Sequence, residues 1–177
     1  ILKYYQKVDD ALSYLFSSVC DEKKLIKSIF GKKKIVYVDI GTNEGSFLEY
    51  LLKFCTLKKV FCYEPILKLS EELKQKYSSK NIKIFNVALS NKKSLRNFFE
   101  YKISSQSSLY KQNDIFKSLK DLKRVSKVKT GIFDNEFSKD KKIDFCKIDV
   151  QGEEINVLKG MKKNLKKKNI KLLKIEI

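Results

Sequence analysis

The sequence predicts an α/β fold in which a mostly parallel sheet carries helices on both faces. Short runs of β-branched and aromatic residues alternate with longer segments in which apolar residues recur at helical spacing. Hydrophobic residues make up 42% of the 177 residues and charged residues 34%, a balance that allows the chain to bury the core of one domain. The single proline and six glycines exclude a collagen-like or low-complexity chain.

The first thirty residues are expected to be helical. Apolar residues recur at helical spacing between residues 4 and 30, and Gly31 ends the pattern. A run of lysines follows and forms a solvated junction. We therefore expect an N-terminal helical extension over residues 1–31 and a domain over residues 32–177.

The first strand, turn and helix of the domain follow directly. Residues 35–40 form an apolar, β-branched run, as expected of a strand that is buried on both faces. Residues 41–45 contain two glycines and predict a turn, and residues 46–54 place their large apolar side chains on one helical face. The pattern then repeats, with a strand over 59–63, a helix over 67–77 and a strand over 82–89.

The second half of the chain is less regular at first. Its expected elements are an extended segment over 95–103, a serine-rich loop over 104–108, a strand over 125–133, a strand over 143–150, a helix over 152–168 and a final strand over 170–177. Strands that alternate with helices of this length predict βαβ units.

The net charge of +18 arises from 39 basic and 21 acidic residues. A charge of this size favours nucleic acid or an anionic membrane surface as a partner. Two observations favour a different cause. Only Arg96 and Arg124 are arginines, the residue type that binds phosphates and bases bidentately. The abundance of Ile, Asn, Phe and Tyr is typical of an AT-biased genome, so we expect that nucleic acid is not the partner.

The residue types and segments that the sequence lacks exclude some kinds of site and indicate a cellular compartment. The chain has no histidine, which excludes a histidine base and a His-ligated zinc site. None of its four cysteines forms a C-x-x-C pair, and Cys62 and Cys146 lie inside apolar strands, so we expect buried thiols in a reducing, cytoplasmic compartment. No apolar run reaches the ~20 residues of a membrane helix, and the first residues do not form a signal peptide. Because there is no initiator Met, we expect a piece of a longer or processed product.

The turn after the first predicted strand has features of a nucleoside site. Gly41 allows a sharp turn, and Gly45 allows the close approach of a helix or a ligand. Glu64 ends the second strand 23 residues after Gly41, near the ~20-residue offset at which an acidic residue binds ribose hydroxyls. The alternative is an ordinary tight turn between a strand and a helix.

A dinucleotide is excluded as the ligand, because Asn43 and Ser46 stand where its fingerprint requires glycines. Glu44 would also bring negative charge to the place of a pyrophosphate. A ligand with a ribose and no phosphate fits better. S-adenosylmethionine is such a ligand, and the carboxylates of Asp39 and Glu44 would suit its positive groups.

Four ordered blocks then identify a family resemblance. The blocks are V-D-I-G-T-N-E-G at 38–45, F-C-Y-E-P at 61–65, N-V-A-L-S at 86–90 and I-D-F-C-K-I-D-V-Q-G-E-E at 143–154. Together they resemble the FkbM-like S-adenosylmethionine-dependent methyltransferases over about residues 35–177. The resemblance implies a Rossmann-like class I methyltransferase fold.

The resemblance also implies roles for individual residues. Those that would bind S-adenosylmethionine are Asp39, Gly41, Thr42, Asn43, Gly45, Glu64, Pro65, Val87 and Ala88, with Glu64 accepting from both ribose hydroxyls. Catalytic roles fall to Asp149 and Glu154, and substrate binding to Gln106, Ser107 and Ser108. A divalent metal, where one is needed, would be held by oxygen ligands such as Asp149.

Two departures from the family pattern are visible. Gln151 stands where the family usually has Glu, which removes one carboxylate. The chain ends with the fifth predicted strand of the domain, so we expect that the usual C-terminal antiparallel strands are missing. Asp149 and Glu154 also have structural alternatives, since Asp caps turns and Glu favours a helix N-terminus.

The expected function is O-methyl transfer from S-adenosylmethionine to a hydroxyl of a sugar, a glycan or another small molecule, with polysaccharide modification as the implied setting. One alternative is an RNA methyltransferase, in which Tyr4, Tyr5, Phe98, Phe99 and Tyr101 would stack on bases. Another is a binding domain with impaired catalysis. We expect acceptor choice to depend on the region 95–135.

Overall fold

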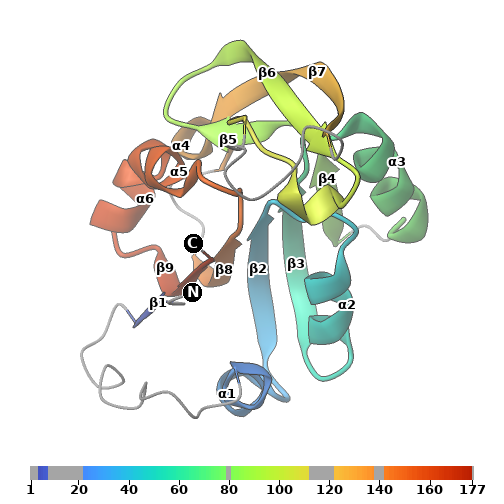
Figure 1. The fold of residues 1–177 in the computed structure, drawn as a ribbon. Coiled ribbons are helices and arrows are strands. Elements are labelled where there is room, and N and C mark those ends of the chain that lie inside the picture. The colour runs from blue at the N-terminus through green and yellow to red at the C-terminus, as the bar shows by residue number, and fades with distance from the viewer. Residues whose placement is uncertain (1–3, 8–21, 79–80, 112–121, 138–141, 177) are drawn as a thin grey trace.

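The computed structural model describes residues 4–7, 22–78, 81–111, 122–137 and 142–176, and these residues form two sheets (Figure 1). The large sheet contains β1 (Tyr4–Lys7), β2 (Lys34–Ile40), β3 (Thr56–Tyr63), β4 (Ile82–Phe85), β8 (Ile143–Ile148) and β9 (Ile170–Ile175), in the order β1-β9-β8-β2-β3-β4. All neighbouring strands of this sheet are parallel except β1 and β9. The chain order reverses at β2, which lies between β3 and β8.

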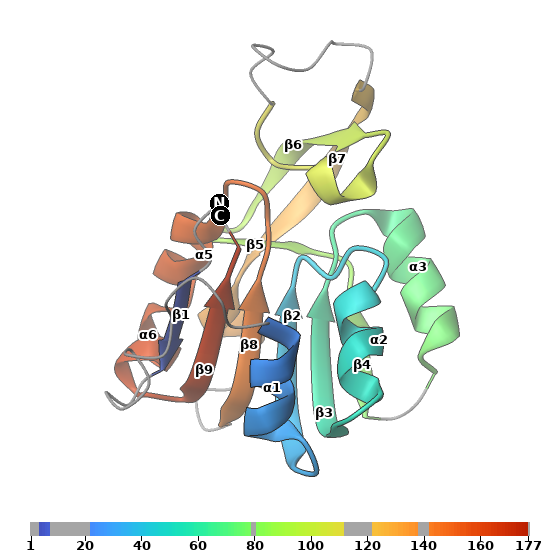
Figure 2. The ribbon, with the colours of Figure 1, turned by 60° about the horizontal axis from the view of Figure 1, so that its bottom comes forward.

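Helices cover both faces of the large sheet, as the sequence predicts (Figure 2). One face packs against α1 (Glu22–Phe30) and α2 (Ser46–Leu52), through a buried cluster that includes Phe30, Tyr37, Leu48, Leu51 and Phe145. The other face packs against α4 (Phe133–Glu136), α5 (Glu154–Gly160) and α6 (Lys162–Lys166), through a cluster that includes Val38, Phe133, Phe137, Val157 and Met161. The helix α3 (Leu67–Lys76) contacts β4, and its Leu73 lies against Gly45 at the start of α2. The α/β, mostly parallel fold is therefore confirmed.

The helical prediction is wrong at residues 4–7. These residues form β1, which pairs antiparallel with β9 from Tyr4↔Ile175 to Lys7↔Leu172. Pairing with an available sheet edge overrides the local helical periodicity, which is a weak signal beside a row of backbone hydrogen bonds. An antiparallel strand therefore does border β9, and it comes from the N-terminal side of the chain. The helix α1 confirms the helical prediction over residues 22–30, whereas the prediction for 8–21 lies outside the described residues.

The structure contains a second, three-stranded sheet, of which the sequence predicted two strands as separate extended segments. It contains β5 (Ala88–Ser90), β6 (Ser94–Tyr101) and β7 (Leu122–Ile132), in the order β5-β7-β6. The extended segments expected over 95–103 and 125–133 are confirmed as β6 and β7, which pair antiparallel. The strand expected over 82–89 is instead divided between the two sheets. The Asn86 amide donates to the carbonyls of Glu64 and Pro65 and holds the chain in a bend there.

The helix expected over 152–168 is also divided, into α5 and α6. Gly160 lies against β5, so that a Cβ at this position would be 2.3 Å from the Ser90 carbonyl oxygen. A second helix, α6, then begins at Lys162. The Asp134 carboxylate accepts from the backbone N–H groups of Lys163 and Asn164 and so stabilises its N-terminus. Both causes come from residues distant in sequence, which is why periodicity alone predicted one continuous helix.

Candidate active site

A pocket lies at the carboxyl ends of β2, β3 and β8, next to the small sheet. Its lining atoms surround about 600 Å³ of empty space, part of which is open to solvent. Its position also agrees with the rule that ligands of open α/β sheets bind where the strand order reverses. The lining residues are Ile40, Gly41, Asn43, Tyr63, Glu64, Pro65, Ile66, Val87, Ala88, Leu89, Phe98, Ser104, Ser105, Ser107, Leu109, Asp149, Val150, Gln151 and Glu153.

Gly41 brings two strand ends together at the floor of the pocket. Its φ is +82°, and a Cβ at this position would lie 1.8 Å from the Asp149 carbonyl oxygen. The Asp149 N–H donates to the Ile40 carbonyl at 2.9 Å. Any side chain at residue 41 would therefore separate β2 from β8, and only glycine satisfies both the backbone conformation and the contact.

Glu64 forms the polar end of the pocket. Its carboxylate is 3% exposed and accepts from the Asn43 N–H through Oε2 and from the Ile66 N–H through Oε1, both at 2.8 Å. Burial raises the pKa of Glu64 to about 7, and the two backbone hydrogen bonds oppose the rise. Each carboxylate oxygen retains lone-pair capacity, so the carboxylate can accept from further hydroxyl donors.

The pocket continues beside Glu64 as an apolar slot. Its walls are Pro65, Ile66, Val87, Ala88 and Leu109, and Phe98 closes it from the small sheet. An apolar slot next to a carboxylate fits adenosine, which presents a flat aromatic ring next to the hydroxyls of a ribose. Ile66, Phe98 and Leu109 were not predicted. Phe98 reaches the slot through the pairing of β6 with β7, and the bridge between Phe99 and Ser108 brings Leu109 beside it.

Asp39, Thr42 and Gly45 belong to the same turn but do not line the pocket. Burial raises the pKa of Asp39 to about 6, an effect that the nearby Lys147 opposes. Neither oxygen of Asp39 has a hydrogen-bond partner among the described residues. The Thr42 hydroxyl donates back to the Asp39 carbonyl, and Gly45 lets α3 pack closely, because a Cβ there would be 2.8 Å from Leu73.

Asp149 lines the pocket, as expected of a catalytic residue, but both its oxygens are occupied. Lys147 donates to Oδ2 at 2.9 Å, and the Gln151 amide donates to Oδ1 at 2.8 Å. The Lys147 side chain is itself buried, and its ammonium lies 5.8 Å from the centre of the Phe47 ring. This arrangement fixes the position of the Asp149 carboxylate between a lysine and an amide donor.

Glu154 does not line the pocket. Its carboxylate accepts from the backbone N–H groups of Val150 and Gly152 at 3.0 to 3.3 Å, and so holds the turn between β8 and α5. The preceding residue, Glu153, lines the pocket instead and was not predicted. No sequence signal marked it, because its partners Ser90 and Arg96 are about 60 residues away along the chain.

The serine-rich loop contributes to the pocket in part. Ser104, Ser105 and Ser107 line it, whereas Gln106 and Ser108 do not. Ser107 accepts from the Tyr101 N–H, and Ser108 donates to the Gln151 carbonyl at 2.6 Å. The loop is thus tied both to β6 and to the turn after β8.

Two of the five aromatic residues expected on an RNA-binding surface are buried. Phe98 is 5% exposed and Tyr101 is 8% exposed, so neither presents a face on which a base could stack. The described residues contain no group of three or more side chains that could hold a metal ion. None of the described helices is long and apolar enough to span a membrane.

These residues fit S-adenosylmethionine by an unpaired polar atom as well as by shape. The Asn43 side-chain oxygen belongs to a pocket-lining residue and is a buried acceptor without a partner among the described residues. Buried acceptors of this kind are costly unless a donor reaches them. The amino group of the methionine tail is such a donor, and Glu64 would receive the ribose hydroxyls.

Comparison with known proteins finds a family match for this chain. A family model described as "Methyltransferase FkbM domain" matches residues 39–177. The crystal structure of methyltransferase FkbM from Methylobacillus flagellatus KT is similar, with a TM-score of 0.52 and 16% identity over 76% of this chain. This chain spans 30% of the length of that protein.

A second solved structure, a SAM dependent methyltransferase from Aquifex aeolicus, has a TM-score of 0.41 and 16% identity. The matched region covers 81% of this chain and 57% of that one. No curated protein matches the chain.

Proposed function

Because the chain belongs to the FkbM methyltransferase family, we propose that it binds S-adenosylmethionine and transfers the methyl group to a hydroxyl of a sugar, a glycan or another small molecule. The observation that carries this proposal is the pocket that joins the Glu64 carboxylate to an apolar slot at the reversal point of the sheet. A ribose and an adenine require these two environments side by side.

Different residues of the chain would bind different parts of S-adenosylmethionine. Glu64 accepts from the ribose hydroxyls, and Val87 and Ala88 flank the adenine. Asn43 and the Gly41 turn bind the methionine tail, while Asp39 lies behind that turn and Gly45 positions it. When bound, S-adenosylmethionine supplies a methyl carbon activated by a positively charged sulfur.

The acceptor side of the pocket is formed by the serine loop and the turn after β8. Ser104, Ser105 and Ser107 provide hydroxyl groups there, and Asp149 provides negative charge. Excluding water and aligning the acceptor oxygen with the methyl carbon supply most of the rate enhancement in a reaction of this kind. A sugar is the acceptor that best uses several hydroxyl partners in one wall.

A cytoplasmic location forms part of the same proposal. Cys55, Cys62 and Cys146 are free and buried, and burial raises the pKa of each thiol. Buried thiols that form no disulfide are typical of proteins from reducing compartments.

Calorimetric titration with S-adenosylhomocysteine tests the proposed cofactor site. We expect wild-type protein to bind in the micromolar range and Glu64→Ala to bind at least tenfold more weakly, because the ribose hydroxyls lose their acceptor. Glu71→Ala is the matched control, since Glu71 is an exposed glutamate on α3.

Three outcomes separate the candidate functions. A folded wild-type chain that does not bind S-adenosylhomocysteine would contradict the proposal. Binding that depends on Glu64, followed by methyl transfer to a sugar hydroxyl, would support it. Binding without transfer to any hydroxyl compound would favour a domain with impaired catalysis.

A further inference from the structure

The pocket is lined by three carboxylates among the described residues, and they differ in one respect. Both oxygens of Glu64 and both oxygens of Asp149 accept hydrogen bonds from the protein. Glu153 is different, because its Oε2 is buried and has no hydrogen-bond partner among the described residues. A buried carboxylate oxygen in this state is unfavourable until a donor reaches it.

The other oxygen of Glu153 is held firmly. Its Oε1 accepts from the Ser90 hydroxyl at 2.6 Å, from Arg96 at 2.8 Å and from the Asn156 amide at 3.3 Å. The whole side chain is 1% exposed. Three donors on one oxygen fix the rotamer, and therefore fix the direction in which Oε2 can accept a hydrogen bond.

Arg96 is suited to holding the Glu153 carboxylate in place, and its own side chain is held on two sides. It is one of only two arginines in a chain with 39 basic residues. Its guanidinium lies 5.4 Å from the centre of the Tyr110 ring, so it is held by Glu153 on one side and by an aromatic face on the other. An arginine provides directed hydrogen bonds that a lysine would not.

Building on the function proposed above, we propose that Glu153 is a catalytic residue whose Oε2 accepts the hydrogen bond of the acceptor hydroxyl and receives its proton. A lone pair of the hydroxyl oxygen forms the new bond to the methyl carbon. The bond between that carbon and sulfur breaks, and its electron pair remains on sulfur. The O–H bond breaks as its proton passes to Oε2, which balances the step.

The neighbourhood of Glu153 indicates a carbohydrate as the acceptor. Arg96 and Asn156 also line an open groove, together with Asn91, Ser94 and Tyr110. The Asn91 amide donates to the Asn156 side chain at 3.1 Å, and Asn156 donates to the Tyr110 hydroxyl at 3.2 Å. Amide, hydroxyl and aromatic groups in one groove match the hydroxyls and the apolar face of a sugar ring.

Binding measurements separate this role from cofactor binding. The protein is saturated with S-adenosylhomocysteine and titrated with methyl glycosides of hexoses, 6-deoxyhexoses and hexuronic acids. We expect wild type and the control Glu71→Gln to bind at least one glycoside. We expect Glu153→Gln to bind it at least tenfold more weakly, while its affinity for S-adenosylhomocysteine stays within twofold of wild type.

Kinetics and two further variants sharpen the test. Methyl transfer to the bound glycoside should fall at least a hundredfold in kcat/KM for Glu153→Gln. Asn91→Ala should weaken the glycoside at least threefold without changing the affinity for S-adenosylhomocysteine. If Glu153→Gln does not fold, Glu153→Asp gives the same comparison, because it keeps the charge beside Arg96 but withdraws the carboxylate.

Each contrary outcome has a distinct meaning. If Glu153→Gln loses affinity for S-adenosylhomocysteine tenfold, Oε2 serves the methyl donor and the assignment is wrong. If the variant binds and methylates the glycoside as wild type does, Glu153 has no role in transfer. If wild type binds S-adenosylhomocysteine but none of the glycosides, the carbohydrate class is wrong. A wild-type chain that binds no S-adenosylhomocysteine overturns the proposed function, and this assignment with it.

Discussion

Glu64 combines a buried carboxylate with a pKa of about 7, and its protonation affects folding. Its ordinary pKa in an unfolded chain is 4.5. Between these two values the folded state binds more protons than the unfolded state, so the free energy of unfolding falls as pH rises. Above pH 7 the full cost of the buried anion is present.

This sign gives a prediction for Glu64→Gln. We expect the free energy of unfolding of wild type to decrease by about 3 kcal/mol more than that of the variant between pH 4.5 and pH 7.5. Urea denaturation at several pH values measures it. Asp39, whose pKa is also raised, is present in both proteins, so the difference isolates Glu64. Parallel pH curves for the two proteins would contradict the prediction.

Individual residues differ in how far the sequence could predict them. Gly41, Asn43, Glu64 and Asp149 lie next to predicted strand ends, and strand ends of a parallel sheet meet at one edge, so their convergence was predictable. Glu153 was not predictable, because its environment is created by Arg96 from another sheet. The structure also assigns Glu154 backbone hydrogen bonds that a sequence motif does not reveal.

Among the elements, α6 depends on a single side chain outside it. Asp134 is buried, and its carboxylate accepts from the backbone N–H of Lys163 at 2.7 Å and from the backbone and side chain of Asn164. A five-residue helix has too few internal hydrogen bonds to be stable alone. The Asp134 carboxylate therefore performs the function of an N-terminal cap from a distance.

We expect Asp134→Ala to lower the free energy of unfolding by about 2 kcal/mol, because it leaves buried donors without an acceptor. The backbone amides of residues 163–166 should exchange with solvent faster as well. Chemical denaturation and hydrogen exchange measure the two effects. Asn135→Ala is the control, because Asn135 is exposed on α4, the helix that also contains Asp134. Equal stability of the two variants would contradict the role of Asp134.

Among the helices and strands, the sequence predicted those that depend on their own periodicity and turn residues. The β2, α2, β3 and α3 succession was recognisable because each element carries its own periodicity and turn residues. The strand β1 and the division of the strand expected over 82–89 were missed, because pairing partners and not periodicity decide them. The small sheet likewise depends on contacts between segments separated by about 40 residues.

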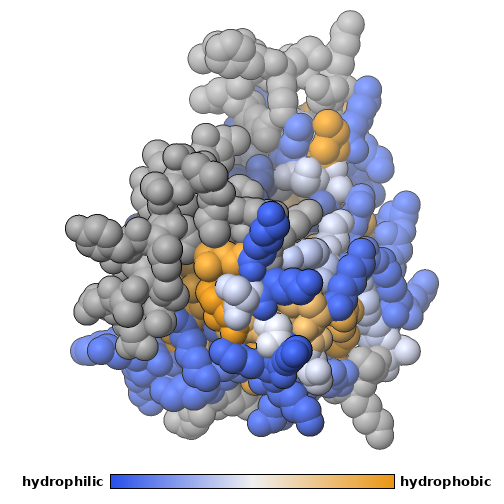
Figure 3. Space-filling model, turned by 90° about the horizontal axis from the view of Figure 1, so that it is seen from below, coloured by the Kyte–Doolittle hydropathy of each residue, from blue (hydrophilic) through white to orange (hydrophobic). Residues whose placement is uncertain are grey.

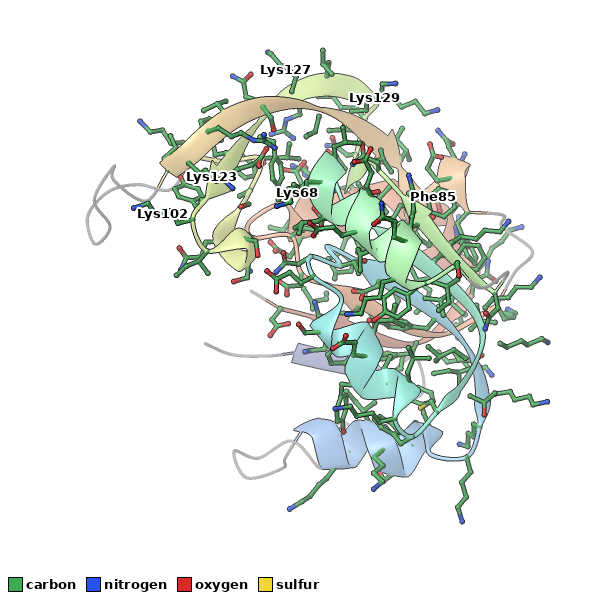
Figure 4. All side chains as sticks on the ribbon, turned by 90° about the vertical axis from the view of Figure 1, so that its right-hand side faces the viewer. Lys68, Phe85, Lys102, Lys123, Lys127 and Lys129 are labelled. Atoms are coloured by element: carbon green, nitrogen blue, oxygen red, sulfur yellow. The ribbon has the colours of Figure 1, made fainter. Side chains whose placement is uncertain are left out.

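For the molecule as a whole, the charge of +18 arises from an excess of basic residues, and most lysines in the described part of the chain are exposed. Lys123, Lys127 and Lys129 come from one strand, β7, and all three are exposed (Figure 4). The face seen from below is also largely hydrophilic around its apolar patches (Figure 3). Like charges at this density repel one another and oppose the compact state.

Screening of this repulsion should therefore stabilise the protein. We expect the Tm at pH 7 to rise by several degrees between 50 and 500 mM NaCl, because the Debye length falls below the spacing of surface charges. Differential scanning calorimetry measures it. The same titration near pH 9.6, the isoelectric point of the sequence, should give little change. A Tm that falls with salt at pH 7 would show that attractive ion pairs dominate instead.

The bend at Asn86 has a further consequence for how such an enzyme could diversify. It divides one continuous stretch of chain between the large sheet, whose strand ends lead into Gly41 and Glu64, and the small sheet, which carries Arg96 and Phe98. Substitutions in β6 and β7 at positions other than Phe98 could therefore accumulate while the large sheet keeps its fold. Descendants of one ancestral chain could acquire new acceptors through changes in β6 and β7. Laboratory exchange of these two strands between relatives would divide the chain at the same boundary.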